Sequence, residues 1–286
     1  MESQSELDGL IAERYPNIDA FNENIPQILM KLGFSKDKAQ YLADHIRAEP
    51  SRSAGHARGA GMRDEMALLR IRTENGKMNY NAFNIAMHEL GHTVEQTLSM
   101  NMIDHTMLEG VPNTAFTEAI AFLFQGKDRE ILGLSPEDSN PEAAIHSYLS
   151  TCEIAAMSLV DMAAWRYLYS RPDAEPADFK RNVLDAANSI WAKYWEPHFG
   201  KSDDSILAIY SHMITYCLYL PDYPIGHIIN HQLENYFKSH DLASELERIC
   251  ALGNIYPDLW MEKAVGEPIS PDELLSDAIA AIKTLG

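Results

Sequence analysis

What this chain can fold into is restricted most by one short run, His88-Glu89-Leu90-Gly91-His92. The run lies in residues 79–98, a stretch without proline. Apolar residues recur there at helical spacing, at Phe83, Ala86, Met87, Leu90, Val94 and Leu98. This spacing predicts one helix with a single buried apolar stripe. Residues four apart lie one above the other on a helix, so His88 and His92 face the same side.

Two imidazoles on one helix face form a suitable pair of ligands for zinc. Zinc accepts imidazole nitrogen at about 2.0–2.1 Å in a tetrahedral shell. Glu89 projects about 100° further round the helix, so its carboxylate misses the metal but can reach a metal-bound water as general base. The pattern also arises by chance, and a third ligand would strengthen the interpretation.

A candidate third ligand follows in the next predicted helix, residues 113–125. Glu118 is the one acid of this otherwise apolar segment. Burying a carboxylate without a partner is unfavourable, so Glu118 either faces solvent or meets a cation. Two histidines and a glutamate leave the fourth zinc position open for water, as in catalytic rather than structural sites. The sequence therefore predicts one zinc ion per chain, bound by His88, His92 and Glu118.

These motifs resemble the gluzincin metallopeptidases. Glu118 stands in Thr-Glu-Ala-Ile-Ala, 26 residues after His92, where that family has its ligand glutamate. The closer resemblance is to the largely helical branch that includes thimet oligopeptidase, oligopeptidase F, carboxypeptidase Taq and angiotensin-converting enzyme. It continues through residues 159–166 and 211–229 and corresponds to the catalytic lobe alone.

The resemblance implies a fold and a mechanism. The expected fold is mainly α, a zincin-like helical metallopeptidase lobe with a small β-sheet or edge strand before the metal-binding helix. Zinc would lower the pKa of its water, and Glu89 would take the proton. His212 and Tyr223 correspond to the residues that stabilise the oxyanion. The expected activity is hydrolysis of oligopeptides by a zinc-dependent metallopeptidase.

One departure from the resemblance is Phe122. Angiotensin-converting enzyme has an acid at this place, one turn after the ligand glutamate, and that acid orients a zinc histidine. Here a backbone carbonyl or another acid must take the role, or the site is weaker. Two alternatives stay open: a catalytically silent descendant whose helical body binds peptide or protein, and a zinc hydrolase of a non-peptide bond.

The expected strand is Met66–Thr73, which precedes a turn at Asn75-Gly76. Its alternation from Leu69 onward indicates a strand, and the resemblance implies an edge strand that pairs with the substrate backbone. The glycine-rich residues 50–64 lack the Gly-Lys-Ser/Thr of a phosphate loop, so a mobile loop at the cleft is favoured.

His227 and His231 are also four residues apart. No glutamate follows His227 directly, and no third ligand is evident nearby. Histidines of the core or of the cleft are therefore favoured over a second metal site.

The whole chain is expected to form a single catalytic domain, residues 1–286. It would contain N-terminal helices (1–49), the edge strand and zinc helices (50–130), and a helical subdomain (131–286). Within this subdomain, the apolar pattern predicts long helices over 142–169 and 177–195 and a further helix over 205–220. The net charge of −19 makes nucleic acid and anionic membranes poor partners. Three scattered cysteines predict no disulfide framework, and no apolar segment is long enough to cross a bilayer. A cytoplasmic location is expected, unless a signal segment was trimmed.

The helical peptidases that this chain resembles are considerably longer and bind substrate in a channel between two lobes. The 87 residues before His88 are too few for a full opposing lobe. We therefore expect the zinc on the floor of an open groove, which a second chain or a missing N-terminal lobe would cover.

Overall fold

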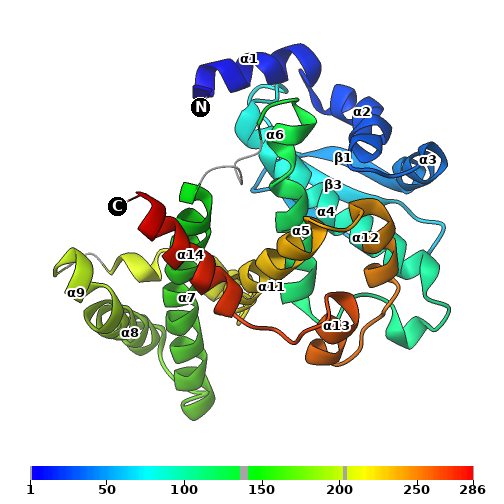
Figure 1. Ribbon diagram of the computed structural model, residues 1–286. Helices are drawn as coiled ribbons and strands as arrows, with labels where there is room; N and C mark the ends of the chain where they lie inside the picture. Colours follow the sequence, from blue (N-terminus) through cyan, green and yellow to red (C-terminus); the bar gives the residue numbers. More distant parts are fainter. Residues whose placement is uncertain (1, 136–140, 202–204, 286) are drawn as a thin grey trace. The chain divides into compact units, whose positions relative to one another are not determined.

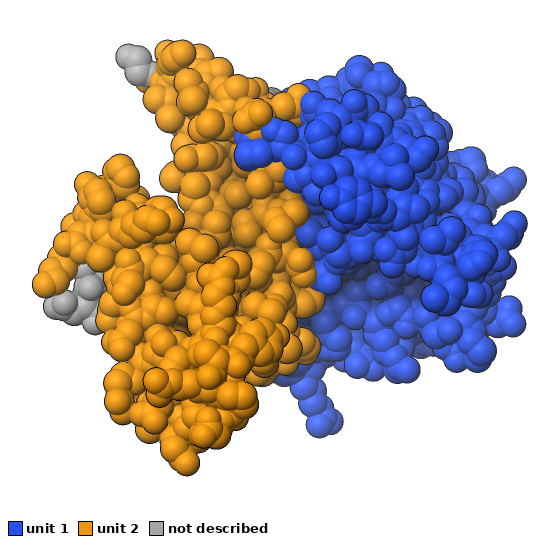
Figure 2. Space-filling model, turned by 90° about the horizontal axis from the view of Figure 1, so that it is seen from below, with its two compact units in different colours: residues 1–140, 229–271 blue, residues 141–228, 272–286 orange. Residues whose placement is uncertain are grey.

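The computed structural model describes residues 2–135, 141–201 and 205–285, and these are mainly helical with one small sheet (Figure 1). The chain divides into two compact units, coloured separately in Figure 2. Unit 1 takes residues 1–140 and 229–271, and unit 2 takes residues 141–228 and 272–286. The expected mainly α fold, with a small sheet before the metal-binding helix, is confirmed.

Three helices open unit 1: α1 (Gln4–Arg14), α2 (Ile18–Lys31) and α3 (Lys36–His45). Each begins where a polar side chain accepts a backbone N–H of the first turn, from Ser3, Asn17 and Ser35 respectively. The expectation of helices up to residue 49 is wrong at its end. Ile46 and Ala48 are buried in a strand, because this segment finds a pairing partner in the sheet.

The sheet contains β1 (Ile46–Ser51), β2 (His56–Arg58) and β3 (Ala67–Arg72), in the order β1-β3-β2. β1 runs parallel to β3, and β2 runs antiparallel to it. The alternating apolar residues of β3 are buried, so the predicted strand is confirmed. It is the central strand, however, and not an edge. An edge position belongs to β2, which lies inside the stretch that we expected to be a mobile loop.

The two helices that follow the sheet are α4 (Tyr80–Met102) and α5 (Thr114–Gln125), capped by Asn79 and Asn113. They pack closely at Gly91, where a Cβ atom would lie 2.7 Å from the Cα of Ala121. Only glycine permits this approach. The short helices η1 (Thr106–Leu108) and α6 (Asp128–Ile131) flank α5 in sequence.

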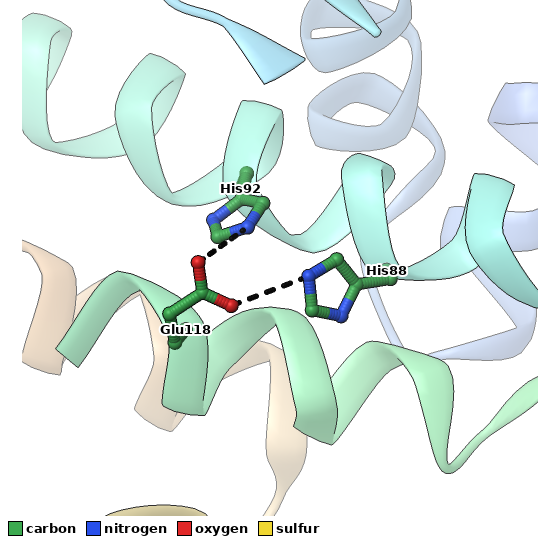
Figure 3. Close-up of side chains that lie close together, drawn as sticks. All are labelled: His88, His92 and Glu118. Atoms are coloured by element: carbon green, nitrogen blue, oxygen red, sulfur yellow. Dashed lines mark ion pairs between the residues drawn. The ribbon is translucent and has the colours of Figure 1, made fainter. Parts of the chain in front are cut away.

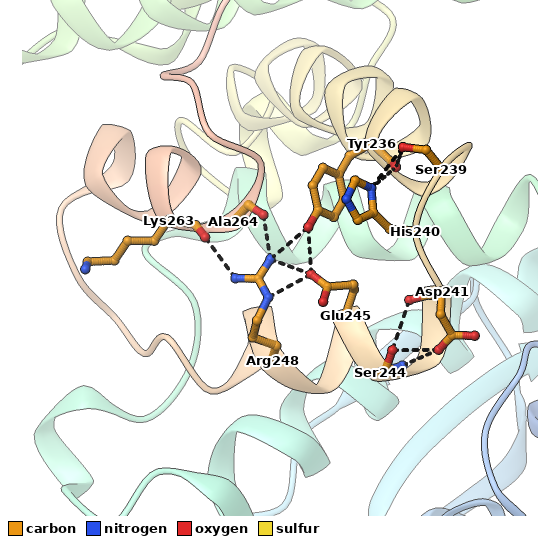
Figure 4. Close-up of polar contacts among 9 residues, drawn as sticks. All are labelled: Tyr236, Ser239, His240, Asp241, Ser244, Glu245, Arg248, Lys263 and Ala264. Carbon is orange, nitrogen blue, oxygen red and sulfur yellow. Dashed lines mark hydrogen bonds and ion pairs between the residues drawn. The ribbon is translucent and has the colours of Figure 1, made fainter.

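Arg248 of α12 (Leu242–Cys250) connects the helices that complete unit 1 (Figure 4). Its guanidinium donates to the carbonyl oxygens of Lys263 at 2.8 Å and Ala264 at 2.6 Å, at the end of α13 (Pro257–Ala264). It also pairs with Glu245, which accepts a hydrogen bond from Tyr236 of α11 (Asp222–Phe237). Carbonyls that a helix end leaves unsatisfied are thus bonded, and three helices are held together.

Unit 2 contains the long helices α7 (Pro141–Ser170), α8 (Pro176–Tyr194) and α14 (Asp272–Leu285), the short α9 (Glu196–Phe199), η3 (Ile206–Ala208) and α10 (His212–Thr215), and the start of α11. The long helices predicted over 142–169 and 177–195 are confirmed. The single helix expected over 205–220 is wrong. Leu218 has a φ of 56°, which a regular helix excludes, and two short helical turns with irregular connections stand there instead.

Among the described residues, no helix has both the length and the apolar character needed to cross a membrane. The three cysteines, all described, are free.

Candidate metal centre

Helices α4 and α5 bring together the three residues that the sequence predicted as metal ligands (Figure 3). The Nε2 atom of His88 lies 3.4 Å from Oε2 of Glu118, and Nε2 of His92 lies 3.6 Å from Oε1. One potential ligand atom from each residue lies within 4.8 Å of the other two. Glu118 thus turns one carboxylate oxygen toward each imidazole.

The chemistry of this group fits a divalent metal ion. The side chain of Glu118 is 2% exposed, and burying an ionised carboxylate to this extent is unfavourable unless a cation or hydrogen-bond donors compensate for the lost hydration. Two imidazole nitrogens and one carboxylate make up a donor set that transition metals bind. In the part of the chain that the structure describes, His227 and His231 join no group of three potential ligands.

Burial controls the protonation of the group. It lowers the pKa of His92 to about 4, so this imidazole is neutral and has a lone pair available. Burial also lowers the pKa of His88, but the hydrogen bond and the charge of Glu118 outweigh it, and the net pKa is raised. For Glu89, burial raises the pKa to about 7, a value suited to a general base near neutral pH.

Glu89 lies against strand β2 and the residue before it, Gly55. Its carboxylate accepts a hydrogen bond from the backbone N–H of Ala57 in β2. At Gly55, a Cβ atom would lie 3.2 Å from Oε1 of Glu89 and 2.4 Å from Cγ2 of Ile85. Gly55 and Ala57 were not predicted as site residues, although the glycine-rich composition of residues 50–64 was a signal for them.

Each histidine has a polar partner on the side away from Glu118. Nδ1 of His88 lies 3.0 Å from Oε1 of Gln125, and Nδ1 of His92 lies 2.8 Å from Oγ1 of Thr117. These two side chains occupy the role for which the sequence suggested a backbone carbonyl or another acid. The ring of Phe122 packs edge-on against His88, with centroids 5.2 Å apart.

The structure places His212 and Tyr223 in unit 2, at the start of α10 and in the first turn of α11. Their rings meet edge to face with centroids 6.1 Å apart, and Tyr216 and Tyr219 lie on the same histidine. The two residues are therefore neighbours. That they serve the metal centre of unit 1 stays a prediction.

Neither a protein-family model nor a curated protein matches the chain. Solved structures do. A protein described as oligoendopeptidase F from Bacillus anthracis str. Ames has a TM-score of 0.61 at 13% identity, covering 99% of this chain and 53% of its own. A second structure, also described as oligoendopeptidase F, has a TM-score of 0.63 at 14% identity, covering 99% of this chain and 55% of its own.

A third structure, BsuCP, has a TM-score of 0.60 at 13% identity, covering 99% of this chain and 65% of its own. The chain thus spans between half and two thirds of the length of these proteins. At such low identity the likeness concerns the fold. Over nearly its whole length, the chain shares the fold of the matching part of these three structures.

Proposed function

We propose that this chain is the catalytic lobe of a zinc-dependent metallopeptidase that hydrolyses oligopeptides. One observation carries the proposal: the ligand atoms of His88, His92 and Glu118 converge within 4.8 Å, and α4, which carries the two histidines, also presents the buried Glu89. Two histidines and one glutamate are the ligand set of catalytic zinc sites that keep a position open for water.

The residues of the site divide the chemistry among them. Bound zinc would supply Lewis acidity, which makes a water molecule nucleophilic at neutral pH and polarises a carbonyl group. Glu89 takes the proton of the attacking water and delivers it to the leaving amine. The N–H of Ala57 holds one side of the Glu89 carboxylate, so the base keeps its orientation while it changes protonation state.

We assign two further roles. His212 and Tyr223 donate hydrogen bonds to the oxyanion that develops on the attacked carbonyl, a role that rests on the resemblance and on their contact with each other. The extended substrate backbone pairs beside β2, because this strand is at the edge of the sheet and contacts Glu89. The strand expected to have this role, over Met66–Thr73, corresponds to β3, which is central in the sheet.

The partner of the lobe follows from the lengths of similar proteins. The chain covers 53–65% of the three structures described above. We propose that the substrate groove is completed by a second chain or by an N-terminal lobe, and that nucleic acid and membranes are not partners, given the net charge of −19.

The proposal is tested by digestion of a peptide library, with products identified by mass spectrometry. The zinc-loaded chain should cleave peptides, and both chelator treatment and the Glu89→Gln substitution should abolish cleavage. Metal binding without cleavage, in the chain alone and at high protein concentration, would instead identify a silent peptide-binding module. Cleavage of ester or amide substrates but not of peptides would identify a hydrolase of a non-peptide bond.

A further inference from the structure

A line of three hydrogen bonds connects the metal-facing His88 to a buried carboxylate. Nδ1 of His88 lies 3.0 Å from Oε1 of Gln125. Nε2 of Gln125 donates to Oδ1 of Asn84 at 2.6 Å, and Nδ2 of Asn84 donates to Oδ2 of Asp128 at 2.7 Å. We call this line the Asp128 relay. Asp128 is 4% exposed, so its carboxylate is directed at the protein and not at solvent.

Three elements meet in the relay. Asn84 stands in α4 one turn before His88, Gln125 is the last residue of α5, and Asp128 is the first residue of α6. The relay therefore depends on the packing of the C-terminal end of α5 and the start of α6 against α4. It involves no residue that binds the metal except His88 itself.

The chemistry of the last member gives the relay a direction. An ionised carboxylate only accepts hydrogen bonds, so Asn84 must turn its NH₂ group toward Asp128. The oxygen of Asn84 then faces Gln125 and accepts from its NH₂ group. The oxygen of Gln125 consequently faces His88, and only a proton on Nδ1 can bond to it. This leaves the lone pair of Nε2 directed at Glu118 and a metal ion.

We propose that Asp128 is a positioning residue for the metal centre: through Asn84 and Gln125 it holds His88 in the tautomer that binds metal through Nε2. The proposal deepens the function proposed above and rests on its metal site. The amides of Asn84 and Gln125 alone would not fix this tautomer, because each can rotate by 180° and exchange its oxygen and NH₂ group with little change in shape. In the reversed order Gln125 would donate to Nδ1, and the proton of the neutral imidazole would move to Nε2.

Glu118 favours the reversed order of hydrogen bonds, in which the proton of His88 is on Nε2. Its Oε2 atom lies 3.4 Å from Nε2 of His88, so in the absence of metal it favours a proton on Nε2. That proton would block the metal. The Asp128 relay opposes this hydrogen bond between Nε2 of His88 and Glu118. A proton on Nε2 would leave the oxygen of Gln125 facing the lone pair of Nδ1, with no hydrogen between them.

His92 has a shorter arrangement of the same kind. Its Nδ1 atom lies 2.8 Å from Oγ1 of Thr117, and the Thr117 side chain in turn bonds to the carboxylate of Glu95. Glu95 is 2% exposed and also accepts from Ser99 at 3.1 Å. Both imidazoles of the site are thus backed by neutral side chains, two for His88 and one for His92, and then by a buried acid.

The test uses the tautomer of His88, read by long-range proton–nitrogen NMR in the metal-free chain at about pH 9, where imidazole is neutral. A Glu118→Ala background removes the competing carboxylate. With the relay intact, His88 should carry its proton on Nδ1. Asp128→Asn should move the proton largely to Nε2, because the amide introduced at position 128 allows the reversed order.

A second substitution should rescue the first. In Gln125→Glu/Asp128→Asn, the new carboxylate at position 125 accepts directly from Nδ1 of His88 and from Asn84, so the proton should return to Nδ1. Asp104→Asn, which removes an exposed carboxylate in the same unit, should leave the tautomer unchanged. If Asp128→Asn prevents folding, Gln125→Met serves in its place, since it cuts the relay beside His88 and should also release the proton to Nε2.

Zinc affinity gives the second readout, measured with Glu118 present by competition with a chromophoric chelator. Asp128→Asn should weaken zinc binding by about 10- to 100-fold, as for other partners of metal-bound histidines, and the double variant should recover most of the loss. A proton that stays on Nδ1 in Asp128→Asn overturns the inference. A chain that shows the expected tautomers but binds no zinc contradicts the proposed function and leaves the relay established.

Discussion

Gly55 approaches Glu89 so closely that a Cβ atom at this position would lie 3.2 Å from Oε1 of the carboxylate. The same atom would lie 2.4 Å from Cγ2 of Ile85, one turn before Glu89 on α4. The backbone of residues 55–57 therefore covers the proposed base directly, and Ala57 gives it a hydrogen bond. The backbone of the sheet thus positions the carboxylate of Glu89.

Gly55→Ala should lower kcat while the chain remains folded. The methyl group cannot fit at 2.4 Å from Ile85, so β2 must move away from α4 and take the N–H of Ala57 with it. We expect a loss of about 10²-fold, since a small misplacement near the chemistry has effects of this order. Gly61→Ala is the matched control, because its Cβ would meet only the carboxylate end of the exposed Glu65, at 3.1 Å. Equal kcat values for the two variants would refute the role of Gly55.

Thr117→Val should weaken zinc binding by about 10-fold or more, because it removes the acceptor of His92 Nδ1 without changing the size of the side chain. Thr117→Ser keeps the hydroxyl and should keep most of the affinity. Chelator competition on the two variants measures the difference. If both bind zinc equally well, the hydroxyl does not orient His92.

The buried Glu95 should make the stability of the metal-free chain depend on pH. Burial raises the pKa of this carboxyl to about 7 in the folded chain, against 4.5 for the ordinary group. Below pH 4.5 it is protonated in both states, and between there and pH 7 the unfolded chain loses its proton first. The folded state is therefore destabilised progressively as the pH rises through this window.

Glu95→Gln removes that dependence. The variant should gain stability relative to the parent chain as the pH rises from about 4.5 to 7, by roughly 3 kcal/mol in total, and the gain should then level off. Urea unfolding of both chains, with chelator present, measures the difference at each pH. Glu89 titrates in both chains and cancels. A difference that stays constant across the window would show that Glu95 does not titrate there.

Tyr223→Phe should lower kcat by about 10²- to 10³-fold with little change in KM, as expected for the loss of one oxyanion donor. Tyr216→Phe is the control, since Tyr216 also contacts His212 but is 60% exposed. Steady-state kinetics with one cleaved peptide suffice. If both variants keep the parental kcat, the role carried over to Tyr223 fails.

The parts of the site that could be predicted from sequence have a regular spacing. His88, His92 and Glu118 stand on helices with strong apolar periodicity, so their placement followed from the helix repeat and from the expense of burying an acid. The missing acid at Phe122 correctly indicated that the histidines need other partners. Those partners could not be foreseen, because Asn84, Gln125 and Asp128 meet only through the packing of three elements, and amide side chains have no characteristic spacing.

Two parts of the fold could not be predicted from the sequence, for different reasons. β2 has three residues, too few for an alternating pattern, and its neighbouring glycines suggested a loop. The segment 205–220 has a helix-like composition, but the left-handed backbone of Leu218 interrupts it. The buried carboxylate of Asp161 faces the backbone N–H groups of Leu218 and Leu220, so tertiary contacts determine the local conformation.

The most direct test of the account is zinc titration of the chelator-stripped chain, followed by metal analysis. The account predicts one zinc ion per chain, retained at the same stoichiometry in Glu89→Gln and lost in Glu118→Ala, because Glu118 supplies a ligand atom and Glu89 only a base. A parent chain that folds but binds no zinc, or Glu118→Ala that binds it as tightly as the parent, would contradict the metal site on which the proposed function depends.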